Sequence, residues 1–156
     1  QAATGKATTL KKSPVGYFVL SIMAGAYVGL AIVLIFAVGA PFSAAASPWT
    51  KLVMGVSFGV ALSLVIMAGS ELFTGNVMVM TIGLLRRTVS PADLGATWVV
   101  SLAGNLAGSL LVAWLVAEAG VFSAAPHLGF IQKTVETKMT LPASENADAP
   151  VGVAAQ

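Results

Sequence analysis

The apolar stretch over residues 52–85 constrains the fold most, because it is too long for one membrane crossing and too short for two. It holds 34 residues and a single charge, Glu71. As one helix it would be ~51 Å long, against ~30 Å for the hydrocarbon core of a bilayer. As two crossings, its second part, residues 72–85, would reach only ~21 Å. We therefore expect one crossing that is interrupted at residues 69–76, within the segment MAGSELFTGN.

Two further apolar stretches, residues 15–36 and 94–117, carry no charge and are each long enough to span a bilayer. Only 9% of the chain is charged, whereas soluble domains carry about 25%. The sequence therefore predicts an all-α membrane protein with three transmembrane spans, the second interrupted by a loop.

Helix start signals agree with three spans. A Ser-Pro pair precedes each apolar region: Ser13-Pro14, Ser47-Pro48 and Ser90-Pro91. Serine is a good N-cap, and proline suits the first helical position, where its missing N–H costs nothing. Asp93, three residues after Ser90, completes a looser version of the capping box.

Basic residues in the short flanks predict the orientation. Five of them precede the first span or follow the second: Lys6, Lys11, Lys12, Arg86 and Arg87. Only Lys51 lies between the first two spans. We expect a cytoplasmic N-terminus and the chain after Ala117 outside.

Four segments are expected along the chain. They are a cytoplasmic N-terminal segment (1–12), a three-span half-domain (13–118), an extracytoplasmic segment (119–143) and a disordered tail (144–156). Within the third segment, residues 126–140 have the composition of an amphipathic or interfacial helix. His127 is the only histidine, and we interpret it as a solvated loop residue.

Composition excludes several functions. The chain has no cysteine, and it offers neither a nucleophile–base pair nor a cluster of metal ligands. Its net charge of +2 is too small to indicate nucleic-acid binding. We expect a non-enzyme without a cofactor.

The interruption is the predicted functional element, because irregular backbone at membrane depth is tolerated only against protein or a water-filled cavity. The candidate pore or gate loop consists of Leu72, Phe73, Thr74, Gly75 and Asn76, with residues 77–85 as a short second half-helix. Glu71 is interpreted as holding the loop by accepting its N–H groups, or alternatively as meeting the permeant. Thr74 is either a hydroxyl donor to a solute or a helix cap. Leu72 and Phe73 form a hydrophobic constriction or face lipid.

Small residues recur on all three spans and predict close packing against other helices. They cluster at residues 24–29, at Gly55 and Gly59, and at Gly104 and Gly108. Phe58 and Leu62 lie one turn apart on one helix face, where periodicity alone favours plain packing.

Three blocks, SIMAGAYVGL (21–30), MGVSFG with GSELFTG (54–59 and 69–75), and GNLAG (104–108), together resemble the N-terminal half of the formate/nitrite transporter family. Their order and spacing match, and the residues of AGAYVGL and GSELFTG are most similar to those of the nitrite channel branch. The resemblance implies a six-span, aquaporin-like protomer built from two inverted three-span repeats and assembled as a pentamer. It also implies passage of small monovalent anions such as nitrite or formate, channel-like or coupled to protons. The same resemblance implies a location in the bacterial cytoplasmic (inner) membrane.

By the same resemblance, Leu72, Phe73 and Thr74 form a flexible gate, and Phe58 and Leu62 form a constriction. The chain departs from the family's pattern, because it has no histidine within a span and no lysine at the place where the family's second repeat carries one. Asn76 also replaces the residue that follows the motif in nitrite-type members. The family's proton-donating role is therefore assigned to no residue.

The chain thus corresponds to one inverted-repeat half of an aquaporin-like fold. Three interpretations remain open: a fragment of a longer gene, a chain that assembles with a separate second half, and a self-sufficient homo-oligomer. Two alternative functions also remain, a non-transporting membrane subunit and a neutral-solute channel.

Overall fold

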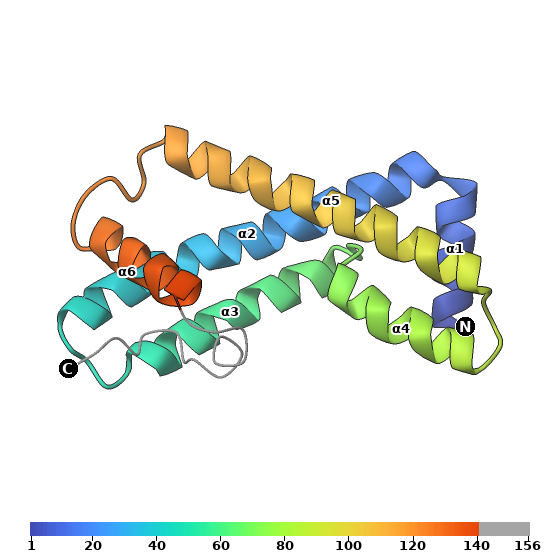
Figure 1. Ribbon diagram of the computed structural model, residues 1–156, viewed down its shortest axis with the longest axis horizontal. Coiled ribbons are helices and arrows are strands. Elements are labelled where there is room, and N and C mark those ends of the chain that lie inside the picture. Colours follow the sequence, from blue (N-terminus) through green and yellow to red (C-terminus); the bar gives the residue numbers. More distant parts are fainter. Residues whose placement is uncertain (141–156) are drawn as a thin grey trace. The chain divides into compact units, whose positions relative to one another are not determined.

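The computed structural model describes residues 1–140, and these form helices joined by short connections (Figure 1). The helices are α1 (Ala2–Lys12), α2 (Pro14–Ala44), α3 (Thr50–Met67), α4 (Phe73–Leu85), α5 (Pro91–Glu118) and α6 (His127–Thr140). Three of them, α2, α3 and α5, are long and apolar enough to cross a membrane, while α4 is a shorter apolar helix. The all-helical class and the three spans agree with the sequence. The expected disordered tail, residues 144–156, lies outside the described residues.

Two of the three predicted helix starts are found where the Ser-Pro pairs place them, since α2 begins at Pro14 and α5 at Pro91. At α5 the capping box is complete. The Ser90 hydroxyl accepts the Asp93 N–H at 3.1 Å, and the Asp93 carboxylate accepts the Ser90 N–H at 3.2 Å. The start of α3 differs, because Thr50 is the first helical residue and its N–H bonds the Ser47 carbonyl at 3.3 Å.

The described chain forms two compact units, of which the first comprises Gln1–Leu30 and Ala61–Trp114. A small core in this unit joins α1 to α4 (Figure 1). Ala3 and Ala7 of α1 are buried with Met80 of α4, and Gly83 lets Ala3 approach closely. The sequence did not predict α1, because its residues are mostly small or polar and carry little apolar periodicity.

Within the first unit, helices α2 and α5 cross so closely that their backbones are in contact. A Cβ at Gly25 would overlap the Asn105 backbone, and a Cβ at Gly108 would overlap the Ile22 carbonyl. A Cβ at Gly104 would overlap the Ser21 side chain. The predicted small-residue packing therefore holds for the first and third spans.

The glycine pair of α3 differs. A Cβ at Gly55 or Gly59 would meet no atom of the described residues within 4 Å. The close backbone approach found at Gly25 and Gly108 is therefore not seen at Gly55 among the residues that the structure describes.

Of the described residues, the second unit contains Ala31–Val60 and residues 115–140. In it, α6 occupies the stretch for which a helix was expected. The Phe130 ring of α6 meets the Phe36 ring of α2 edge-on, with centroids 5.9 Å apart. The prediction for His127 was wrong, because its ring is half-buried and bonds the Ala37 carbonyl at 3.2 Å.

Candidate functional site

Helix α3 ends through a glycine C-cap at the start of the predicted interruption. Gly69 has φ +62°, a left-handed conformation that glycine adopts without steric cost. Its N–H bonds the Ile66 carbonyl at 3.2 Å, and the Ser70 N–H bonds the Val65 carbonyl at 3.0 Å. This is the Schellman arrangement, which satisfies the last carbonyls of a helix. The helix therefore stops at Met67 for a local, sequence-encoded reason.

The non-helical segment is shorter than the sequence predicted. It covers residues 68–72, and α4 begins at Phe73 rather than after Asn76. Of the five candidate gate residues, only Leu72 precedes the helix, as its N-cap. The Asn76 N–H already bonds the Leu72 carbonyl at 2.9 Å, so residues 73–76 form the first helical turn. Contacts from other helices override the poor helix propensity of this TGN sequence.

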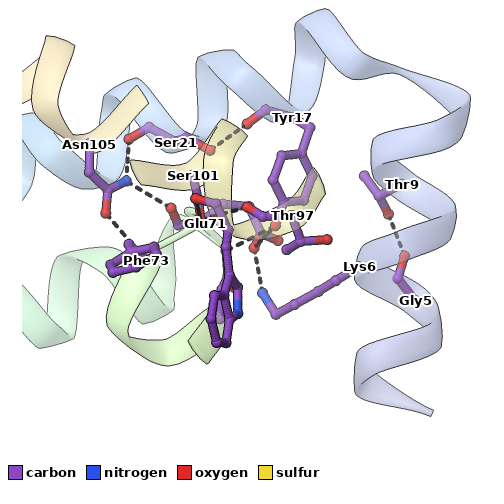
Figure 2. Close-up of polar contacts among 12 residues, drawn as sticks. Gly5, Lys6, Thr9, Tyr17, Ser21, Glu71, Phe73, Thr97, Ser101 and Asn105 are labelled. Atoms are coloured by element: carbon purple, nitrogen blue, oxygen red, sulfur yellow. Dashed lines mark hydrogen bonds and ion pairs between the residues drawn. The ribbon is translucent and has the colours of Figure 1, made fainter. Parts of the chain in front are cut away.

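Asn105 of α5 supplies the most extensive of these contacts (Figure 2). Its side-chain oxygen accepts the Phe73 N–H at 2.8 Å. Its amide nitrogen donates to the Glu71 carbonyl at 3.0 Å and to the Ser21 carbonyl of α2 at 2.8 Å. One amide thus satisfies backbone groups on both sides of Leu72 that the break leaves without helical partners. We call these three bonds the Asn105 clamp.

The Glu71 carboxylate is held by side chains from two other helices (Figure 2). Lys6 of α1 donates to it at 2.5 Å, and the Tyr17 hydroxyl of α2 donates at 2.9 Å. The same hydroxyl accepts the Asn76 side-chain amide at 2.9 Å. These donors differ from the loop N–H groups that the sequence interpretation expected. Glu71 is only 8% exposed as a residue. The lysine neutralises its carboxylate, which burial would otherwise destabilise.

The remaining predicted residues do not join this network. Thr74 is exposed as the second residue of α4, so it is not the N-cap. Leu72 and Phe73 are half-buried, and the Phe73 ring meets the Trp98 ring edge-on at 6.4 Å. Phe58 and Leu62 are 43% and 52% exposed on α3. The structure therefore brings Glu71 and Asn76 together but leaves Thr74, Phe58 and Leu62 at the surface of this chain.

Sequence reasoning missed Lys6, Tyr17 and Asn105 as members of the site. A signal existed for Asn105, since an amide in the middle of a charge-free span needs hydrogen-bond partners. Tyr17 and Lys6 gave a weaker signal, because their partner lies 54 and 65 residues away.

Together, three helices that are long and apolar enough to cross a membrane, and the buried polar side chains that hold the α3–α4 connection, define a helical membrane protein. Comparison with known proteins identifies the group. The formate/nitrite transporter family matches over residues 1–147, and the chain belongs to this family.

Individual relatives agree. The chain is 42% identical over 132 residues to the nitrite transporter NirC of Salmonella typhimurium, covering 85% of this chain and 48% of that protein. It is 41% identical over 142 residues to a probable formate transporter of Methanothermobacter thermautotrophicus, covering 88% and 52%. A solved FNT family ion channel superposes with a TM-score of 0.79 at 40% identity, covering 92% and 56%. The chain thus spans about half the length of the relatives it matches.

Proposed function

We propose that this chain contributes to a membrane conduit for small monovalent anions of the nitrite or formate type, acting as a channel or as a proton-coupled transporter. Family membership supports the substrate class, because relatives over the same residues are named as nitrite and formate transporters. The observation that carries the proposal is the Asn105 clamp. It holds a non-helical segment between two apolar helices, the kind of backbone that membrane proteins keep only beside protein or a water-filled path. We assign the chain no enzymatic role.

In this proposal α3, residues 68–72 and α4 make one interrupted crossing. Helix α3 alone is ~27 Å long and α4 ~20 Å, so α4 is too short to cross by itself. The three spans then form one inverted-repeat half of an aquaporin-like fold. The short break and its fixed donors support a loop with a defined position.

The permeation path of this proposal passes the break and the first turn of α4. Thr74 offers an exposed hydroxyl to the anion from the first turn of α4. Leu72 and Phe73, which are half-buried, belong to the gate loop. Phe58 and Leu62 of α3, whose side chains are exposed, form the constriction. Gly75 and Asn76 shape the same turn. Glu71 holds the loop rather than meeting the anion, because its carboxylate is bound by Lys6 and Tyr17.

We further propose that the protein lies in the bacterial inner membrane with its N-terminus cytoplasmic. The basic residues before α2 and after α4 support this orientation. The conducting assembly is oligomeric. It is either a homo-oligomer, a pentamer by the family resemblance, or a complex with a separate second half.

The proposal is tested by reconstituting the purified chain in liposomes and measuring nitrite, formate and glycerol flux. We expect flux of both anions well above that of glycerol, and a protonophore distinguishes channel behaviour from proton coupling. Equal glycerol flux would favour a neutral-solute channel. Absence of anion flux from a folded oligomer would rule out conduction by this chain alone, and co-reconstitution with a second-half chain would then test the complex.

Thr74→Val tests the gate with Thr74→Ser as its matched control. Removal of the hydroxyl should lower anion flux about tenfold, the effect of losing one hydrogen bond of ~1.4 kcal/mol, while serine keeps the donor. Equal flux in both variants would remove Thr74 from the path.

A further inference from the structure

Helix α2 contains a proline, Pro41, that leaves a backbone acceptor without its helical donor. Proline has no N–H, so it cannot bond the carbonyl four residues earlier, that of Ala37. Ala37 is half-buried, and buried backbone carbonyls in native proteins are almost always paired. This carbonyl therefore requires a donor from elsewhere.

His127, the first residue of α6, supplies a donor. Its Nε2 lies 3.2 Å from the Ala37 carbonyl oxygen, although 90 residues separate the two in sequence. A carbonyl oxygen can only accept, so Nε2 must carry the proton, which selects one tautomer of the ring. The His127 ring also lies 5.6 Å from the Phe122 ring.

The geometry points to a functional pair: His127 supplies the hydrogen bond that Pro41 removes, and this bond fastens α6 to α2. His127 is then a positioning residue, and its role exists only because residue 41 is proline. All these residues lie in the second unit, so the inference goes beyond the proposed function and stands independently of it. The Phe36–Phe130 contact is a second fastening between the same helices.

Amide hydrogen exchange of α6 in the reconstituted chain measures this fastening. His127→Phe keeps an aromatic ring beside Phe122 but has no donor. Loss of one hydrogen bond should raise α6 exchange rates about 5- to 10-fold. His127→Gln retains a side-chain N–H at a similar reach, and its exchange rates should stay within about twofold of the wild type.

The decisive comparison uses Pro41→Ala, in which alanine provides the N–H that the Ala37 carbonyl lacks. In that background His127→Phe should change α6 exchange by less than about twofold, because the carbonyl is already satisfied. Phe130→Leu is the matched control. It weakens the Phe36 contact instead, so its acceleration should persist when Pro41→Ala is present.

Two results with His127→Phe would overturn the pairing. One is wild-type exchange of α6 in His127→Phe. The other is an equal acceleration by His127→Phe with and without Pro41. A His127→Phe protein that fails to fold leaves His127→Gln as the test, and faster α6 exchange in a folded His127→Gln protein would also contradict the inference.

Discussion

The Lys6 ammonium of α1 binds the Glu71 carboxylate in the break between α3 and α4, and so joins the first helix of the chain to the connection between these two apolar helices. Both side chains are partly buried. Removing one partner of such a pair costs more than removing both, because a desolvated charge remains.

Lys6→Met should therefore destabilise the break by about 1.5–3 kcal/mol, the range for a hydrogen bond to a charged group. Adding Glu71→Gln should restore part of this loss, since the amide carries no charge. Hydrogen exchange of the first turn of α4 measures both variants. If the stability loss of the double variant equals the sum of the losses of the two single variants, the charges do not interact.

Tyr17→Phe removes the hydroxyl that lies between the Glu71 carboxylate and the Asn76 amide. The fully buried ring keeps its packing, but the Asn76 donor loses its acceptor, at a cost of about 1–3 kcal/mol. Tyr27→Phe on the same helix is the control and should change stability by less than about 0.5 kcal/mol. Equal unfolding midpoints in denaturant for the two variants would contradict the assigned role of the hydroxyl.

Asn105→Asp separates the acceptor role of the Asn105 side chain from its donor role. Its carboxylate still accepts the Phe73 N–H but cannot donate to the Glu71 and Ser21 carbonyls. We expect exchange of the α4 first turn to rise at least tenfold. Ser109→Ala, which removes one bond to the Gly25 carbonyl, should leave this turn unchanged. The prediction fails if both variants protect the turn as the wild type does.

Alanine substitutions at the α2–α5 crossing should distinguish close contact from helix propensity. Gly108→Ala places a Cβ against the Ile22 backbone, which cannot move like a flexible side chain, so it should cost roughly 1–3 kcal/mol. Gly95→Ala on the same helix meets no atom of the described residues within 4 Å and should stabilise by about 0.5–1 kcal/mol. Thermal unfolding in detergent compares them, and a stabilising Gly108→Ala would exclude the crossing.

The spans of this fold could be predicted from the sequence because each rests on local information. The lengths of the uncharged apolar stretches predicted the spans, and the Ser-Pro pairs predicted the starts of α2 and α5. Length arithmetic also placed an interruption near Gly69, where the left-handed conformation ends α3.

The extent of the break could not be predicted, because its donors come from far along the chain. Thr74, Gly75 and Asn76 are poor helix formers, yet they are helical because Asn105 caps Phe73 from another helix. Likewise, the partners of Glu71 lie on α1 and α2, and no spacing in the sequence pairs Lys6 or Tyr17 with it. Local propensity was informative for helices and uninformative for these tertiary hydrogen bonds.

The central claim is that the clamped break is the functional element of an anion conduit. The most direct test measures nitrite flux into liposomes containing the wild type, Asn105→Ala or Ser109→Ala at equal protein content. We predict nitrite flux for the wild type, a fall of at least tenfold for Asn105→Ala, and a change below about twofold for Ser109→Ala. Nitrite flux through Asn105→Ala equal to that of the wild type would contradict the claim.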